Sequence, residues 1–253
     1  MRLNICETKD DNAFSSENDV PIGGSYTCPI CGKKHNFSFY HILPEAFFES
    51  SRGIVVCSEC HKLLKLINRH IQQEIWRNCH EDLSVAINDF FFSEDYIHGM
   101  RYSLTDSPGN REKIMGFIDL NDKFQIKLNP YQAIHFHRKK QSWTTTDEEG
   151  REVKPKKAKV CAKCGVIYRL GRHHIKDVEI YGANNHYATL CRNCHEDVEE
   201  LKKEVRKFII RECACIFIEI YKIFLIEKIS FNSRKNIWIE IERRGDKYVC
   251  KIK

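Results

Sequence analysis

The 253-residue chain has no uninterrupted apolar run long enough to cross a membrane. Its most apolar segment, residues 208–229, is interrupted by charged side chains, each of which costs free energy at bilayer depth: Arg211, Glu212, Glu219 and Lys222. The first 24 residues also lack the apolar core and the small-residue cleavage site of a secretory signal. We therefore expect a disordered leader over residues 1–24, a cytoplasmic location and no membrane partner.

Acidic residues are scarce in one segment. Residues 151–172 hold eight Lys or Arg and a single acid, Glu152. The net charge of +6 permits a polyanionic partner without requiring one. Such a segment is either a solvated linker or a surface that contacts the phosphates of DNA. Seven of its basic residues are candidate nucleic-acid contacts: Lys154, Lys156, Lys157, Lys159, Lys163, Arg169 and Arg172.

Cysteine, in contrast, is abundant, with 13 in the chain. In a cytoplasmic protein the thiols stay reduced, so metal binding is the first explanation. Eight of them form four Cys-x2-Cys pairs: Cys28 with Cys31, Cys57 with Cys60, Cys161 with Cys164, and Cys191 with Cys194. The other five lack this spacing, and we interpret most of them as small core residues: Cys6, Cys79, Cys213, Cys215 and Cys250.

The four pairs form two similar units. The two pairs of a unit are separated by 25 residues in the first unit and by 26 in the second, and the last cysteine of each unit is followed by a histidine, His61 or His195. Each unit also has a His-Ile dipeptide between its pairs, at His41 and at His174. Two such pairs complete a tetrahedral shell of four thiolates. The sequence therefore predicts two structural zinc ions.

The second unit resembles a known family. Its Cys-x2-Cys pair, the "HHI" at residues 173–175 and the "LCRNCH" at residues 190–195 are similar to the HNH endonucleases with a zinc-ribbon scaffold. That resemblance implies a ββα-metal site in which His173 and His195 hold a divalent cation (Mn, Ni, Mg or Zn) and His174 is the general base. Glu199, one helical turn after His195, is a candidate third ligand or an ordinary acid in a first helical turn. The implied activity is metal-dependent hydrolysis of DNA.

The middle residue of the family signature is less certain in this chain. The family usually has Asn at the position of His186, where it braces the loop that carries the base. Either His186 or its neighbour Asn185 could take that part.

The first unit departs further from the pattern. Tyr40 stands in place of His173, Lys65 in place of Glu199, and Arg52 in place of His186. A tyrosine hydroxyl is a poor ligand for a hard cation, and an ammonium group repels one. We expect a folded zinc ribbon without a catalytic metal. Its remaining function would be to dock nucleic acid, to pack within the chain or to dimerise.

The fold class expected from these features is α+β. We divide the chain into a leader (1–24), a degenerate HNH-like zinc unit (25–94), a β-rich connector (95–150) and a catalytic HNH unit (151–253). Apolar periodicity predicts an amphipathic helix over 61–78 and a second helix from His195 to about Ile229. Two or three short strands are expected around the Ser107-Pro108-Gly109 turn, and a β-hairpin is expected near the C-terminus, turning at Gly245.

Two other functions fit the same residues. One is a non-catalytic double zinc ribbon that binds nucleic acid or protein, and the other is a nuclease directed at RNA. The presence of His173, His174 and His195 in one chain favours an enzyme, since a binding module does not need all three. Partners expected besides DNA are a second copy of the chain, or a protein of a defence or mobile-element system.

Overall fold

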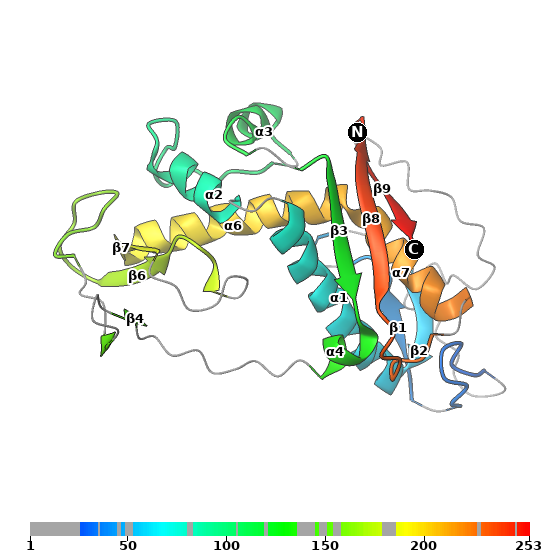
Figure 1. Cartoon of the computed structure of the whole chain (residues 1–253). Helices are drawn as coiled ribbons and strands as arrows, with labels where there is room; N and C mark the ends of the chain where they lie inside the picture. Colours follow the sequence, from blue (N-terminus) through cyan, green and yellow to red (C-terminus); the bar gives the residue numbers. More distant parts are fainter. Residues whose placement is uncertain are drawn as a thin grey trace.

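The computed structural model describes residues 26–34, 36–44, 47–48, 53–79, 83–104, 106–118, 121–135, 145–146, 151–153, 158–178, 186–226, 229–245 and 247–253. The chain is a mixed α+β protein with several small sheets and two long helices (Figure 1), as its sequence predicts. In the part of the chain just listed, no helix is both long and apolar enough to span a bilayer.

The internal repeat is visible as two hairpin–helix units. In the first, strands β1 (Phe37–His41) and β2 (Gly53–Cys57) lead into helix α1 (Ser58–Cys79). In the second, β6 (Leu170–His174) and β7 (Tyr187–Cys191) lead into α6 (Arg192–Glu212). Both hairpins are antiparallel, and each ladder ends at its histidine: His41 pairs with Gly53, and His174 pairs with Tyr187.

The two long helices bury the apolar faces predicted from their periodicity. On α1 the buried face is Leu64, Ile67, Ile71 and Ile75, and on α6 it is Val198, Leu201, Val205 and Phe208. Residues one turn apart on a helix lie on the same face, so each set forms one stripe against the core.

The expected helix to Ile229 is wrong in one respect. Helix α6 ends at Glu212, and a second helix, α7, spans Ala214–Ile226. At Cys213 the backbone leaves the α-helical region, with φ −94° and ψ 19°, and the buried Cys213 side chain fixes this bend in the core. The bend directs the apolar α7 onto strand β9 (Lys247–Ile252), a packing that one straight helix could not reach.

The segment between the units holds more helix than expected. Helix α2 (Leu83–Phe92) lies at the end of residues 25–94, and the connector expected over 95–150 holds α3 (Pro108–Met115), β3 (Lys123–Leu128), α4 (Pro130–Ile134) and β4 (Thr145–Thr146). The strands expected around Ser107-Pro108-Gly109 are wrong for residues 108–115. Ser107 is the N-cap residue of α3 and Pro108 occupies the first helical turn, where its missing N–H is not needed. Strand β4 pairs with β5 (Glu152–Val153).

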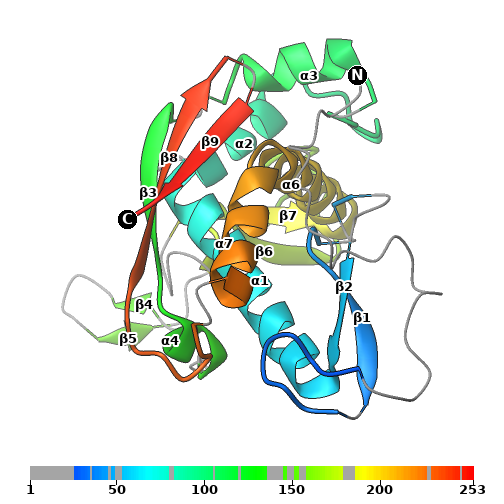
Figure 2. The ribbon, with the colours of Figure 1, turned by 90° about the vertical axis from the view of Figure 1, so that its right-hand side faces the viewer.

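The predicted C-terminal hairpin is confirmed as β8 (Ile237–Arg244) and β9, with Gly245 at φ 62° between them. Ile237, Ile239 and Ile241 face the core, as their alternation predicts. Strand β3 joins β8 in a three-stranded sheet of order β3-β8-β9. The sheet lies on one side of helices α1, α6 and α7, and the β1–β2 hairpin lies on the other (Figure 2).

Candidate metal centres and active site

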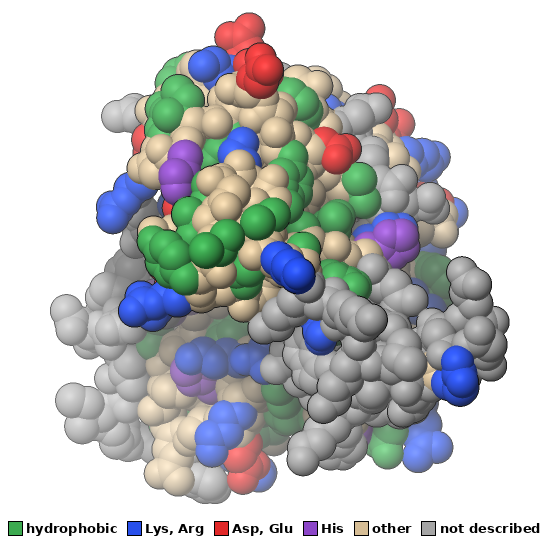
Figure 3. All heavy atoms as spheres, turned by 90° about the vertical axis from the view of Figure 1, so that its left-hand side faces the viewer, with side chains coloured by type: hydrophobic (Ala, Val, Ile, Leu, Met, Phe, Trp, Pro, Cys, Tyr) green, Lys and Arg blue, Asp and Glu red, His purple; other side chains and the backbone are tan. Residues whose placement is uncertain are grey.

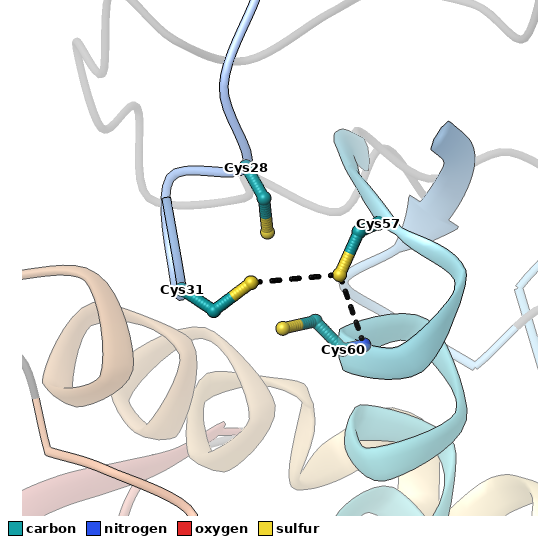
Figure 4. Close-up of side chains that lie close together, drawn as sticks. All are labelled: Cys28, Cys31, Cys57 and Cys60. Carbon is teal, nitrogen blue, oxygen red and sulfur yellow. Dashed lines mark hydrogen bonds between the residues drawn. The ribbon is translucent and has the colours of Figure 1, made fainter. Parts of the chain in front are cut away.

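The eight paired cysteines gather into two clusters of four. Cys28, Cys31, Cys57 and Cys60 form one cluster, and Cys161, Cys164, Cys191 and Cys194 form the other. In each, one pair comes from a tight turn before the hairpin and the other from the junction of strand and helix. Figure 4 shows the four sulfur atoms of the first cluster directed toward one another.

The spacing of the sulfurs fits zinc. The Sγ atoms of Cys31 and Cys57 lie 3.5 Å apart, and those of Cys164 and Cys191 lie 3.6 Å apart. Four thiolates on a tetrahedral Zn²⁺ with bonds of about 2.3 Å have sulfur–sulfur separations of about 3.8 Å. The two clusters can therefore hold two structural zinc ions, as the sequence predicts.

In each cluster the surroundings favour the thiolate form of one cysteine and the thiol form of another: a hydrogen bond with Cys28 raises the pKa of Cys60, and burial raises the pKa of Cys194. A hydrogen bond with Cys60 lowers the pKa of Cys28 to about 4. Burial opposes ionisation of Cys161, but the backbone N–H groups of Cys164 and Cys191 outweigh it and lower the pKa to about 6. A thiolate is the form that ligates metal.

A third group of possible ligands lies where the second hairpin meets α6. His173 from β6, with His195 and Glu199 from the first turns of α6, place one ligand atom each within 4.8 Å of the others. The rings of His173 and His195 lie edge to face, with centroids 5.3 Å apart. The three residues that the HNH resemblance nominates as ligands are thus brought together, and the set can hold a divalent cation.

The tautomer of His173 is set by a residue from outside the hairpin–helix unit. Asn88, buried on α2, directs its amide nitrogen to the carbonyl oxygens of Ser84 at 2.7 Å and of Ile175 at 3.3 Å. Because both of these groups accept, the amide oxygen must face the other way, toward Nε2 of His173 at 3.0 Å. Nε2 therefore carries the proton, and Nδ1 presents its lone pair to the candidate metal site.

Nδ1 of His173 faces a carboxylate oxygen, which is a hydrogen-bond acceptor as well. Oε1 of Glu199 lies 3.3 Å from Nδ1 of His173. A glutamate carboxyl has an ordinary pKa of about 4.3, so Glu199 is ionised at neutral pH. The His173 side chain is fully buried, and burial lowers its pKa and disfavours its own protonation. A lone pair and a carboxylate so close together are best stabilised by a cation between them.

His174, the candidate base, is the next residue on β6. Successive strand residues face opposite sides, so His174 is half-buried while His173 is in the core. Burial, followed by the positive charges of Lys202 and Arg172, lowers the pKa of His174. The ring is therefore neutral at pH 7 and able to accept a proton.

Lys202, like Asn88, was not predicted from the sequence. It lies two turns after His195 on α6, is 8% exposed, and donates from Nζ to the carbonyl oxygen of His174 at 3.1 Å. Its Nζ also lies 3.6 Å from Oε1 of Glu199. The spacing of His195, Glu199 and Lys202 along one helical face is the signal that could have found it.

Of the two residues expected to brace the loop that carries the base, His186 is described and Asn185 is not. The carbonyl of His186 accepts a hydrogen bond from the backbone N–H of Ile175 at 2.9 Å, which extends the hairpin one step past His174. Its side chain is exposed. Asn185 lies outside the described residues, so its part in bracing the loop stays a prediction; Arg52, at the equivalent position of the first unit, also lies outside them.

The basic residues predicted to contact nucleic acid differ in their exposure. Lys159 and Arg169 are exposed, and Arg172 is half-buried with its guanidinium over the ring of Tyr187. Lys163 faces inward, where Nζ donates to the carbonyl of Ser93 at 3.1 Å. Three further candidates lie outside the described residues: Lys154, Lys156 and Lys157.

The described residues of the first unit contain no equivalent third site. The buried Tyr40 packs its ring 5.6 Å from that of His61, and Nδ1 of His61 lies 2.8 Å from the hydroxyl of Ser38. Burial raises the pKa of Tyr40, which keeps its hydroxyl neutral. Among the described residues, the only group of His or carboxylate ligands that could hold a metal is the one in the second unit.

Comparisons of the chain with protein-family models, with curated proteins and with solved structures give no match.

Proposed function

We propose that this chain is a metal-dependent endonuclease of the HNH class that hydrolyses phosphodiester bonds of DNA. The observation that carries the proposal is the arrangement of four residues: His173, His195 and Glu199 converge on one point, and His174 follows on the same strand. A ββα arrangement, in which a hairpin and the start of a helix enclose the point, supports it. The two four-cysteine clusters support a zinc-ribbon scaffold.

The roles follow from the chemistry of each group. A divalent cation held by His173, His195 and Glu199 would act as a Lewis acid that stabilises charge on the scissile phosphate and the leaving oxygen. His174 takes a proton from the attacking water, because its lowered pKa leaves the imidazole neutral. Lys202 fixes the backbone carbonyl of His174 and so positions the strand that carries the base.

Nucleic acid as the substrate is supported by the charge around the site. Residues 153–176 contain no acidic residue, and the exposed Lys159 and Arg169 lie in the loop that leads into β6. Such contacts position a phosphate backbone without reading sequence. We propose DNA as the substrate, and cleavage of RNA alone would redirect the proposal to the alternative nuclease.

For the first unit we propose packing within the chain in place of catalysis. Tyr40 and Lys65 stand where the second unit has two ligands, and Tyr221 of α7 packs into the core of the first unit with Tyr40 and Leu64. A homodimer and a partner in a defence or mobile-element system stay predictions, as does a cytoplasmic location.

The experiment that tests the proposal uses purified full-length chain with supercoiled plasmid, single-stranded DNA and RNA. Each substrate is incubated with Mg, Mn, Ni or Zn, and with EDTA as the control. The proposal expects nicked or linear plasmid that depends on the metal and is absent in EDTA. If no divalent cation supports cleavage of any substrate, the non-catalytic double zinc ribbon becomes the better account.

A further inference from the structure

The loop of the second zinc unit has an exposed apolar tip. Ile167 is 73% exposed and Tyr168 is 66% exposed, more than any other large hydrophobic side chain in the described part of the chain. Val160, 47% exposed, lies in the same loop. The face of the molecule seen in Figure 3 carries hydrophobic side chains interspersed with Lys and Arg. Large apolar side chains exposed side by side indicate a contact surface.

The tip is held rigidly, so its exposure is not that of a frayed end. The backbone N–H of Cys161 bonds to the carbonyl of Val166 at 2.8 Å, and that of Gly165 bonds to the carbonyl of Cys161 at 2.9 Å. Gly165 has φ 75°, a left-handed conformation that glycine adopts without strain. Lys163 anchors the loop to Ser93 after α2. A preorganised tip loses little conformational entropy on binding.

The first unit shows that the zinc loop does not require apolar residues there. Asn36 and Arg169 each lie five residues after the second cysteine of their units, and both have left-handed backbones, with φ 53° and 51°. Counting back from them, Lys34 and His35 occupy the positions of Ile167 and Tyr168. The neighbouring Lys33 pairs with Glu59. The apolar tip therefore belongs only to the unit that carries the candidate active site.

The charge around the tip indicates the chemistry of its partner. Lys159 and Arg169 are exposed in the same loop, and no acid occurs between residues 153 and 176. A partner that suits this surface has negative charge together with flat apolar faces. Nucleic acid combines phosphates with bases whose faces stack on aromatic side chains, and apolar side chains of proteins can also wedge between base steps.

We propose that Ile167 and Tyr168 contact the bases of the DNA held at the active site, with Tyr168 stacking and Ile167 wedging beside it. The inference rests on the proposed nuclease function. Tyr168 lies six residues before His174. At about 3.3 Å per residue, their Cα atoms are at most about 20 Å apart. With a rise of about 3.4 Å per base pair, the contact falls within about six base pairs of the cut.

The test measures binding of the full-length chain to a fluorescein-labelled 20-base-pair duplex by anisotropy, without added divalent cation so that the DNA stays intact. The double variant Ile167→Ala/Tyr168→Ala is compared with wild type and with Trp238→Ala, an exposed residue on β8. We expect the double variant to bind roughly 5- to 160-fold more weakly, the range for losing one stacked base, and Trp238→Ala to bind as wild type does.

The salt dependence distinguishes base contacts from charge contacts. The double variant removes no cation, so its slope of log affinity against log salt should equal that of wild type, whereas Arg169→Ala should reduce the slope by about one. Zinc content and circular dichroism report folding. As a second readout, DNA should quench more of the tryptophan fluorescence in Tyr168→Trp than in wild type, which has three tryptophans of its own. Unchanged affinity of the double variant, or no quenching in Tyr168→Trp beyond that of wild type, contradicts this inference while the nuclease proposal stands. Absence of DNA binding by wild type overturns both and leaves the tip as a protein contact.

Discussion

Oδ1 of Asn88 accepts a hydrogen bond from Nε2 of His173 at 3.0 Å, across 85 residues of sequence. Both side chains are buried. The contact joins α2, which follows α1, to the strand that carries the candidate base. The candidate metal site of the second unit is therefore oriented by a residue outside that unit, and such a hydrogen bond to the second ring nitrogen typically holds a metal-ligating histidine in place.

Replacing Asn88 should weaken the candidate metal site. In Asn88→Ala, Nε2 of His173 loses its acceptor and the ring is free to change tautomer, so we expect the metal concentration for half-maximal cleavage to rise about 10- to 100-fold. Asn88→Asp loses the donor to the carbonyls of Ser84 and Ile175 but keeps an acceptor toward Nε2 of His173, so it should retain more of the metal affinity than Asn88→Ala. Ser84→Ala, a buried neighbour on α2 whose hydroxyl makes no hydrogen bond, is the matched control. Equal metal dependence in Asn88→Ala and wild type would contradict the assigned role.

The zinc assignment predicts loss of fold. Cys164→Ser or Cys191→Ser should unfold the second unit, because structural zinc contributes on the order of 10 kcal/mol of folding free energy in small metallo-domains. Cys215→Ser, outside both clusters, should keep two zinc ions per chain. Zinc content and circular dichroism are the measurements. A natively folded Cys164→Ser protein with unchanged zinc refutes the four-cysteine site.

The asymmetry between the units predicts a mild effect at His41. Since Tyr40 and Lys65 replace the ligands of the second unit, His41→Ala should cleave plasmid within a few fold of wild type. His174→Ala is the matched change in the second hairpin, at the same place in its ladder. Loss of cleavage in a folded, DNA-binding His41→Ala protein would make the first unit catalytic.

The ligand set predicts a metal preference. Two imidazoles and one carboxylate suit transition metals better than Mg. We expect Mn or Ni to support plasmid cleavage at lower concentration than Mg, measured as half-maximal activation. A clear preference for Mg would mean that oxygen ligands dominate the site.

The sequence was most informative where the signal is local. The two four-cysteine clusters follow from cysteine spacing, and the meeting of His173 with His195 beside a hairpin is what the HNH resemblance implies. Asn88 could not be predicted, because a single asparagine on a helix has no motif and its contact is distant in sequence. The pairing of β3 with β8 is long-range for the same reason.

Two local signals were ambiguous. Ser107-Pro108-Gly109 fits a turn between strands as well as the start of a helix. The helix α3 that forms there places Ile114 in the core. The bend at Cys213 has no glycine or proline to mark it, and the burial of Cys213 and the packing of α7 against β9 both depend on contacts distant in sequence.

The central claim, that His174 is the general base beside a cation held by His173 and His195, is tested most directly by plasmid cleavage at saturating metal. We predict that His174→Ala cleaves roughly 100- to 10,000-fold more slowly than wild type, with unchanged zinc content, fold and DNA affinity. His173→Ala and His195→Ala should instead recover part of their activity as the metal concentration is raised. Cleavage by His174→Ala at the wild-type rate would contradict the account.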